Sequence, residues 1–402
     1  MDEIVELGGT LDAPADSTTP EVDARDAIRV GASTNSDPWQ AIKDIRAAIW
    51  QPDMAFVMVF VSPEFDHDAL SGALGRAFGE VPVLGCTTAG EITPAGYAEG
   101  AITAASFSSR HFAASSCLLD RVSSRGIGEI SQLARALAAQ SRPPPGWQQL
   151  ALLLADGISL REDAVVAALD SALAPVPLFG GSAGDGMCFR ETFVIRDGVF
   201  HSDAALVTLL QTDFRFAEVT FDHFLPSGKQ MVVTDARPSE RVVCEINGEP
   251  AAEEYARIVG RAKEQLGPFL FASYPTLVRA GGRYHVRAIQ SVTGDNCLKF
   301  LSAIDVGLVL TIGEAQDIHG EMEKAFQKLA AANGPPTLVL GFDCILRKIE
   351  IVTSGDKDRI SRIFTDNNVI GFSTYGEQHN GMHVNQTFVG IAFFQPDDDP
   401  AC

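Results

Sequence analysis

Side chains able to bind a ligand or a metal ion gather near the end of the chain, in the stretch YGEQHNGMHVNQTF at 375–388. This stretch holds two of the eight histidines of the sequence, together with a glutamate and a methionine. Neutral imidazole is the commonest metal ligand in proteins. His383 leads into an apolar strand and could present its ring to a pocket, whereas His379 lies in the polar turn QHNG and is expected to face water. Because an isolated histidine is more often structural, His383 is a candidate ligand and not an assigned one.

Two further histidines flank the ends of expected strands and are candidates for lining a pocket. His111 follows the apolar segment AITAASFS, and His223 lies between aromatic residues in TFDHFLP. Both are second choices to His383, because neither lies in a segment as rich in potential ligands.

Three turns of small or hydroxylated residues each contain an acid, and their sequences are GCTTAGE (85–91), GGSAGD (180–185) and GFSTYGE (371–377). Their acids are Glu91, Asp185 and Glu377. Carboxylates in such turns can bind a polar ligand, or they can accept hydrogen bonds from the amides of their own turn. The sequence favours neither function over the other. Beyond the third turn, Asn385 and Gln386 could add hydrogen bonds to a small polar ligand.

Cys86, in the first of these turns, could act as a nucleophile if the fold brought a base to it, because only the thiolate attacks. No base lies near it in the sequence, and a small buried residue in a tight turn is the simpler interpretation. The seven cysteines are scattered without a CxxC pair, which argues against a zinc knuckle or an iron–sulfur cluster. The motifs GxxxxGK[ST], HExxH and GxSxG are also missing from the sequence. An enzyme is therefore not expected.

Three short apolar runs have the length and density of strands buried on both faces, and they are AFVMVFV (55–61), LALLLA (150–155) and TLVLGF (337–342). Each is followed by a segment with helical spacing and then by a second apolar run that ends at a turn glycine: Gly85, Gly180 or Gly371. A further strand follows each turn. The sequence thus predicts an α/β fold of layered mixed sheets with outer helices, built from a repeated unit of strand, helix, strand, Gly turn and strand. The segment QHNGMHVN (378–385) is interpreted as an insertion found only in the third unit.

The chain divides into three parts by composition. Residues 1–26 carry eight acids against one arginine and are expected to form a disordered tail. Residues 27–225 contain the first two units and are predicted to form one domain. Residues 226–402 are predicted to form a second domain, which contains the third unit and two helices, at about 250–266 and 318–332.

The bulk composition limits the partners of the protein. With 31 basic and 52 acidic residues the formal net charge is −21, which repels phosphate backbones and anionic membranes. A nucleic-acid or membrane partner is therefore not expected. No apolar run is long enough to span a bilayer, and the first residues do not resemble a signal peptide, so a cytoplasmic location is predicted.

The three Gly turns, the pair VPVLGCTTAGEI and VPLFGGSAGD, and STYGEQ followed by HVNQTF together resemble the FIST sensory family. The resemblance covers nearly the whole chain after residue 27, with an N-terminal and a C-terminal FIST domain. Within this family the C-terminal form is similar to the stand-alone haem proteins of the NosP group.

This resemblance implies a bacterial protein that holds haem b non-covalently, senses nitric oxide and regulates a partner histidine kinase or cyclic-di-GMP enzyme, with effects on biofilms. It implies His383 as the axial ligand, Tyr375 and Met382 as neighbours, and His223 or His111 as reserve ligands. Because the wider family is thought to bind small ligands such as amino acids, a haem-free receptor is the alternative. Self-association is also compatible with the sequence.

Overall fold

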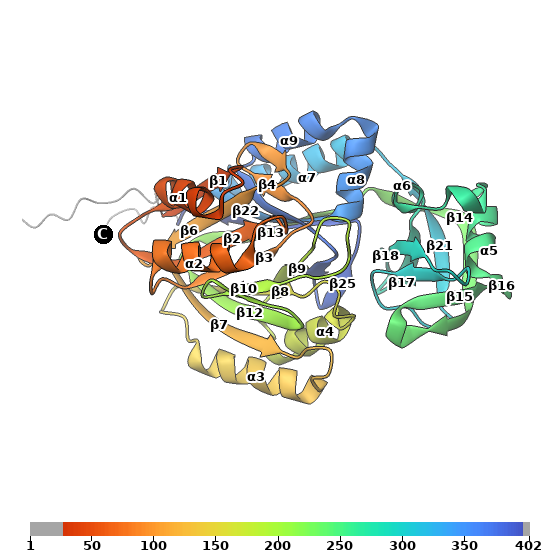
Figure 1. Cartoon of the computed structure of the whole chain (residues 1–402), viewed down its shortest axis with the longest axis horizontal. Coiled ribbons are helices and arrows are strands. Elements are labelled where there is room, and N and C mark those ends of the chain that lie inside the picture. The colour runs from red at the N-terminus through yellow and green to blue at the C-terminus, as the bar shows by residue number, and fades with distance from the viewer. Residues whose placement is uncertain (1–26, 397–402) are drawn as a thin grey trace, which may run out of the picture.

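The structure is a computed structural model that describes residues 27–396, and it consists of a body and a smaller inserted domain (Figure 1). The body contains the first part of the chain and its last part. The inserted domain runs from β14 (Phe224–Arg237) to β21 (Val309–Ala315) and stands to one side of the body. The predicted α/β class with layered mixed sheets is confirmed. The tail predicted at residues 1–26 lies outside the described residues.

Three six-stranded sheets with the same strand arrangement form the body. The strands of the first sheet are β1 (Ile28–Ser33), β6 (Ile102–Ser108), β2 (Met54–Val61), β3 (Val83–Thr87), β10 (Val194–Arg196) and β11 (Val199–His201). Those of the second are β25 (Met382–Val384), β24 (Glu377–His379), β9 (Leu178–Ser182), β8 (Gln148–Ala155), β12 (Ala204–Thr212) and β7 (Phe112–Asp120). Those of the third are β13 (Arg215–Phe221), β26 (Phe388–Phe394), β22 (Leu338–Cys344), β23 (Val369–Thr374), β4 (Glu91–Thr93) and β5 (Gly96–Ala98).

Each sheet is completed by a β-hairpin that comes from another unit of the chain. The hairpin β4–β5, which follows β3 in the chain, pairs with β23 of the third sheet. The hairpin β10–β11 pairs with β3, and the hairpin β24–β25 pairs with β9. The three units therefore exchange hairpins in a cycle, which makes them one structural body.

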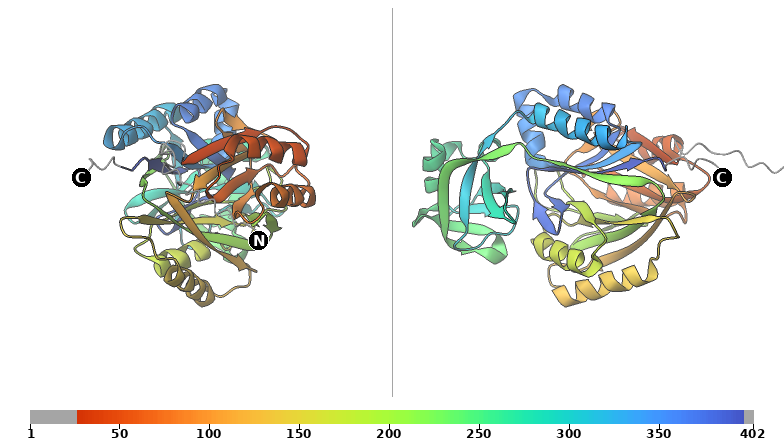
Figure 2. Two further views of the ribbon diagram at one scale, coloured as in Figure 1. Left: turned by 90° about the vertical axis from the view of Figure 1, so that its left-hand side faces the viewer. Right: turned by 180° about the vertical axis from the view of Figure 1, so that it is seen from behind.

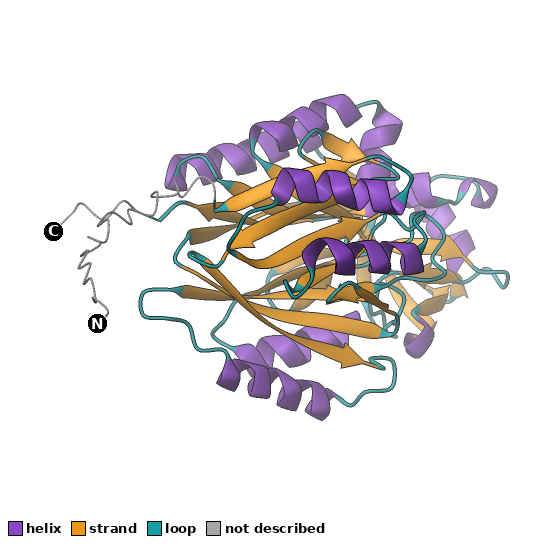
Figure 3. Ribbon diagram, turned by 60° about the vertical axis from the view of Figure 1, so that its left-hand side comes forward, coloured by secondary structure: helices purple, strands orange, loops and turns teal. Residues whose placement is uncertain are grey.

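Helices cover the outer faces of the three sheets (Figure 3). The first sheet carries α1 (Pro38–Ile49) and α2 (His67–Phe78), and the second carries α3 (Ile127–Gln140) and α4 (Glu162–Leu173). The third carries α7 (Ile318–Asn333), α8 (Ile345–Ser354) and α9 (Lys357–Asp366). Helix α1 begins at a typical N-cap residue: the side chain of Asp37 accepts a hydrogen bond from the Gln40 amide at 2.8 Å.

The inner faces of the sheets meet in one apolar core that is rich in phenylalanine. Phe60 of the first sheet and Phe372 of the third have ring centroids 4.8 Å apart. Phe107 lies 6.4 Å from Phe393, again between the first and third sheets. These contacts place several of the 24 phenylalanines of the sequence in the core.

The three turn glycines occupy equivalent places because a neighbouring strand passes very close to each. A Cβ atom at Gly85 would lie 1.9 Å from the carbonyl oxygen of Val59. A Cβ at Gly180 or Gly371 would meet the carbonyl of the adjacent parallel strand at 1.9 and 1.8 Å. Only glycine fits where two backbones approach so closely.

The third unit contains no insertion, so the sequence interpretation of QHNGMHVN was wrong. Glu91 begins the hairpin β4–β5, and Glu377 begins the hairpin β24–β25. In both units the next long strand starts at the same distance along the chain, at Ile102 and Phe388. The two hairpins have equal lengths and different sequences, and the difference in polarity was mistaken for extra residues.

The inserted domain has its own sheet and a small core. Its remaining strands are β15 (Val242–Ile246), β16 (Glu249–Pro250), β17 (Thr276–Ala280), β18 (Arg283–Arg287), β19 (Ile289–Val292) and β20 (Leu298–Phe300). Its helices are α5 (Ala251–Val259) and α6 (Pro268–Ser273), with 3-10 turns η2 (Pro238–Glu240) and η3 (Lys263–Gln265). The body and this domain meet along one side only, as the view from behind shows (Figure 2).

The order of elements places the inserted domain inside the third unit. That unit begins with β13, which pairs with β26, and continues with α7 and β22 after the inserted domain. Over residues 27–396 the chain has no helix long and apolar enough to cross a membrane.

Candidate functional site

The three Gly turns lie together and are joined by backbone hydrogen bonds. The amide of Ser373 donates to the carbonyl of Gly90 at 2.7 Å, and the amide of Gly184 donates to Thr87 at 3.1 Å. The amide of Ser182 donates to Gly376 at 2.8 Å, which closes the ring of contacts. The turns follow the carboxyl ends of parallel strands, where α/β proteins commonly bind ligands.

The predicted acids of the first and third turns have structural partners. Both carboxylates are fully buried and accept a hydrogen bond from a threonine of their own turn, Thr88 for Glu91 and Thr374 for Glu377. The second oxygen of Glu377 accepts from the Thr387 amide at 3.2 Å. Burial raises the pKa of Glu91 to about 7 and that of Glu377 well above its usual value. Both acids therefore stabilise turns instead of facing a cavity.

Asp185, in the second turn, connects that turn to Tyr375. Its carboxylate accepts hydrogen bonds from the amides of Phe189, Arg190 and Glu191 at 2.7, 2.7 and 2.9 Å, and it is bonded to the Tyr375 hydroxyl. The Tyr375 ring stacks on Phe189 with centroids 4.3 Å apart. These contacts hold Phe189 at the junction between the body and the inserted domain.

A small cavity of about 60 Å³ lies at this junction. The body contributes Gly157, Ile158, Leu160 and Phe189, and the inserted domain contributes Arg241, Gln290, Lys299, Phe300 and Leu301. The cavity thus has walls from both parts of the protein, one apolar and one with amide and cationic groups.

Strained backbone conformations gather around this cavity. Leu160, Phe189 and Arg241 have φ angles of 59°, 53° and 55°, in the left-handed region that residues with large side chains rarely adopt. All three line the cavity. Because such conformations are enriched at functional sites, the cluster makes this junction a candidate functional site.

Arg241 forms a buried ion-pair cluster with the first turn of α4. Its guanidinium lies 2.5 Å from Glu162 and 3.0 Å from Asp163, and it also donates to the carbonyl of Leu301. The side chains of Arg241 and Glu162 are only 3% and 1% exposed. Arg287 adds a longer contact of 3.6 Å to Asp163. The cluster is the main electrostatic link between the inserted domain and the body.

Lys299 differs from Arg241 because it has no ion-pair partner within residues 27–396. It lines the cavity from β20 together with Gln290 of β19. An uncompensated cation beside an aromatic wall favours a small ligand that carries a carboxylate.

His383 is fully buried in β25 and lies near this cluster. Burial lowers the pKa of His383 to about 4, although the Asp163 carboxylate opposes the shift, so the ring is neutral at pH 7. Its Nδ1 lies 3.4 Å from the Gln378 amide, and its Nε2 has no hydrogen-bond partner among the described residues. The imidazole is packed against Gly376, where a Cβ would lie 2.2 Å from the ring.

The reserve ligands of the sequence analysis are not brought to His383. The ring nitrogens of His223 face Glu350 at 3.0 Å and Arg347 at 3.3 Å, so both are engaged. His111 lies in the turn after β6 and contacts Asp213 at 3.0 Å. That turn is at the opposite end of the first sheet from Gly85, since Ser108 pairs with Met54 at the start of β2.

The other predicted ligand residues of this segment hold the inserted domain. The Asn385 side chain donates to the Tyr375 carbonyl at 3.1 Å and accepts from the Ala288 amide at 3.4 Å. Gln386 donates to the Ala272 carbonyl at 3.1 Å. Met382 is half-buried in β25, next to His383. The segment is therefore a connection between the body and the inserted domain.

Cys86 is fully buried in β3, and burial raises the pKa of its thiol well above the usual value. Such a thiol stays protonated and does not provide the thiolate that a nucleophile needs.

Several residues of the cavity were not identified from the sequence. Arg241 and Lys299 are two of 31 basic residues, and no spacing distinguishes them from the others. Leu160 and Phe189 stand out only through their backbone angles. No local sequence pattern identifies this site, because its two walls, from residues 157–189 and 241–301, come together only in the folded protein.

Comparisons with known proteins agree with this arrangement at the level of the family. Residues 55–249 match the family model of the FIST N domain, and residues 251–380 match that of the FIST C domain. A search of curated proteins found no match. A crystal structure of cyanuric acid hydrolase from A. caulinodans is weakly similar, with 12% identity, a TM-score of 0.25, and coverage of 46% of this chain and 72% of that one. From the two domain matches, the chain belongs to the FIST family, whose domains are sensory ligand-binding domains of signalling proteins.

Proposed function

We propose that the protein is a receptor for a small carboxylate-bearing metabolite of amino-acid size, bound between the body and the inserted domain. The observation that carries the proposal is the coincidence of a cavity with three strained residues, Leu160, Phe189 and Arg241. Lys299 would pair with the carboxylate, and Phe189 and Ile158 would contact the apolar part of the ligand. Gln290 would supply an amide hydrogen bond.

The size of the cavity connects binding to movement. The cavity volume of about 60 Å³ is far below the roughly 300–1,000 Å³ of ordinary ligand pockets. A larger ligand therefore requires the inserted domain to move away from the body. A ligand that binds better to the more open arrangement shifts the population toward it, and a partner chain can recognise that change.

The proposal predicts that a panel of common amino acids and related carboxylates contains at least one compound that stabilises the protein. Binding to the native state stabilises it by RT ln(1 + [L]/Kd), so a ligand at about 100 times its Kd adds about 2.7 kcal/mol and raises the melting temperature. The measurement is a thermal-shift screen of the full chain. If every compound of the panel leaves the melting temperature unchanged, the proposed ligand class is wrong.

Haem b, with nitric oxide as the signal, is the second candidate, and one observation favours it. His383 is buried and neutral at pH 7, as an axial donor requires, although the Gln378 amide nitrogen beside Nδ1 places the ring proton on Nε2. The available space does not fit: the cavity of about 60 Å³ is far smaller than a porphyrin, and His383 is packed against Gly376. A groove of about 460 Å³ between α1 and α2 contains no histidine. Haem would therefore require a much larger movement of the inserted domain than a metabolite of amino-acid size.

A titration of the purified protein with haemin tests whether the protein binds haem through His383. Specific binding through His383 predicts a sharp Soret band that shifts on adding nitric oxide and is lost in His383→Ala but retained in His111→Ala. An unchanged haemin spectrum, or equal spectra for the two variants, excludes His383 as the ligand. Under either candidate we propose that the signal passes to a partner histidine kinase or cyclic-di-GMP enzyme.

A further inference from the structure

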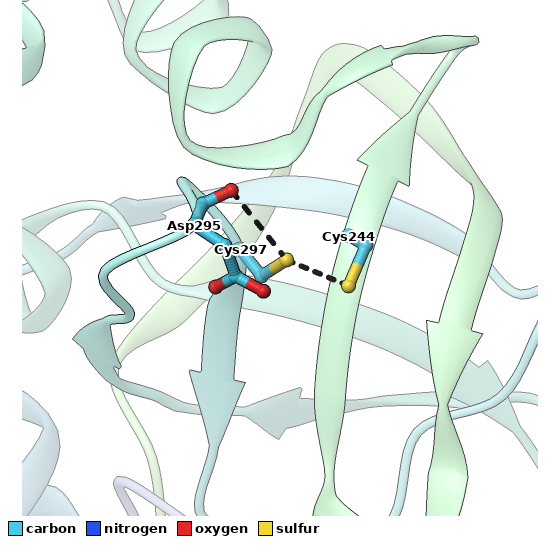
Figure 4. Close-up of side chains that lie close together, drawn as sticks. All are labelled: Cys244, Asp295 and Cys297. Atoms are coloured by element: carbon cyan, nitrogen blue, oxygen red, sulfur yellow. Dashed lines mark hydrogen bonds between the residues drawn. The ribbon is translucent and has the colours of Figure 1, made fainter.

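Two cysteines of the inserted domain, Cys244 and Cys297, lie side by side at two neighbouring antiparallel strands (Figure 4). In β15 and β20, Val242 pairs with Lys299 and Val243 pairs with Leu298. Continuing this register by one step places Cys244 opposite Cys297. Cross-strand neighbours have Cβ atoms roughly 4.5–5.5 Å apart, within reach of a disulfide after a small adjustment.

The two sulfur atoms point at each other. The Sγ of Cys297 lies 2.6 Å from the Sγ of Cys244. A disulfide bond is about 2.05 Å long. Two sulfurs that share a tetrahedral zinc ion, with bonds of about 2.3 Å, are roughly 3.7 Å apart. The observed separation is nearer to the first value than to the second.

Asp295 is the third group of this cluster, and its contacts argue against a metal ion. Its carboxylate is bonded to the hydroxyl of Thr293 and lies 3.4 Å from the guanidinium of Arg237. A cation bound by Asp295 and the two cysteines would have to approach this positive charge. The cluster also offers only three ligands over the described residues, one fewer than a structural zinc site needs.

We propose that Cys244 and Cys297 are a site of reversible thiol oxidation, with a hydroperoxide as the oxidant. The half-buried Cys244 is the more accessible thiol, and Cys297 is 3% exposed. The thiol of Cys244 loses its proton to solvent, and the thiolate attacks a hydroperoxide oxygen. The O–O bond breaks, a sulfenic acid forms, and the alkoxide or hydroxide that leaves takes up a proton from solvent to give an alcohol or water. Cys297 then attacks the sulfur of Cys244, the S–S bond forms, and the hydroxyl leaves as water with the proton of Cys297.

The position of the pair connects it to the cavity. Cys244, in β15, follows Arg241 by three residues, and Cys297, directly before β20, precedes Lys299 by two residues. The two strands are also joined beside the cavity, where the Phe300 amide donates to the Arg241 carbonyl at 2.8 Å. A covalent bond at Cys244 would fix these two strands, and with them the cationic wall. The disulfide itself does not depend on which ligand the cavity binds.

The test is a count of free thiols in the full chain after treatment with hydrogen peroxide. The reduced protein has seven thiols. We expect the oxidised protein to lose two, to regain them with dithiothreitol, and to yield a peptide cross-linked between Cys244 and Cys297 by mass spectrometry. Cys188→Ser, which removes an exposed isolated thiol, should form the same cross-link. Cys244→Ser and Cys297→Ser should form no intramolecular disulfide.

Two results overturn the proposal. One is oxidation that leaves Cys244 and Cys297 unlinked while other thiols react. The other is binding of one zinc ion per reduced chain that is lost in both Cys244→Ser and Cys297→Ser, because the pair would then be a metal site. Since neither variant alters a residue that lines the cavity, the thermal-shift response to carboxylates tests the proposed function independently.

Discussion

Replacing Arg241 by alanine is expected to lower the free energy of unfolding by about 3–5 kcal/mol, the usual cost of removing one partner of a buried ion pair. The variant leaves the buried carboxylate of Glu162 without its cation and removes the main electrostatic contact between the inserted domain and the body. Urea denaturation at pH 7 measures the loss. If the inserted domain unfolds separately, fluorescence and circular dichroism will report two transitions instead of one.

The loss of folding free energy caused by Arg241→Ala should increase with pH. Burial raises the pKa of Glu162 above the usual 4.5, while Arg241 lowers it. Without Arg241 the folded-state pKa rises further, so the protonated carboxyl is favoured in the folded state. The destabilisation of Arg241→Ala should therefore be smallest near pH 4.5 and should grow as the pH rises through the folded-state pKa. A loss that is equal at pH 5 and pH 8 would contradict this explanation.

Two variants control for the removal of a charge and for the carboxylate left behind. Lys324 pairs with Glu321 at 2.7 Å, and the two side chains are 71% and 40% exposed. Lys324→Ala should therefore cost at most about 1 kcal/mol. Adding Glu162→Gln to Arg241→Ala should recover part of the stability, because the amide carries no charge. If Arg241→Ala and Lys324→Ala cost the same, Arg241 does not act as a buried link.

Gly371→Ala is expected to prevent folding of the third unit. The new Cβ would lie 1.8 Å from the carbonyl oxygen of Gly341, and neither parallel strand can move without disturbing the core. The cost should exceed about 4 kcal/mol, in the range of the most damaging single substitutions. We expect insoluble protein, or soluble protein without a cooperative melting transition by circular dichroism.

Gly75→Ala is the matched control. Gly75 lies in α2, and nothing within 4 Å would meet its Cβ. Because alanine is the better helix former, the control should gain up to about 1 kcal/mol. A Gly371→Ala protein as stable as the Gly75→Ala protein would show that the turn glycine is not required for the close approach of the strands.

Local patterns in the sequence predicted much of the body. The apolar run at 55–61 is the centre of β2, and the helix predicted at 318–332 is α7 with one residue added. The glycines at 85, 180 and 371 were recognised from their local sequence; each lies in a strand, β3, β9 or β23, where the carbonyl of the neighbouring strand comes very close. Strand composition, helix spacing and turn chemistry are encoded over a few residues.

The cyclic exchange of hairpins and the cavity could not be predicted in this way. β4 pairs with β23, although almost 300 residues separate them in the chain. A short stretch of sequence does not indicate so distant a pairing partner. From the sequence, the polar residues of β24 and β25 were therefore predicted to form an exposed loop. In the structure Glu377, His383 and Asn385 are buried, because the hairpin β24–β25 belongs to the second sheet and the inserted domain packs against its end. The polar segment is visible in the sequence, but its surroundings depend on the tertiary structure.

The measurement that tests the central claim most directly is calorimetric titration of the carboxylate that gives the largest thermal shift. Lys299→Ala removes the unpaired cation of the cavity, and Lys43→Ala removes a cation from the distant groove between α1 and α2. A ligand bound between the body and the inserted domain should bind Lys299→Ala at least about tenfold more weakly, since a charged hydrogen bond contributes about 1.5–3 kcal/mol. Its affinity for Lys43→Ala should be unchanged. Equal affinities for wild type and Lys299→Ala would contradict the proposed site.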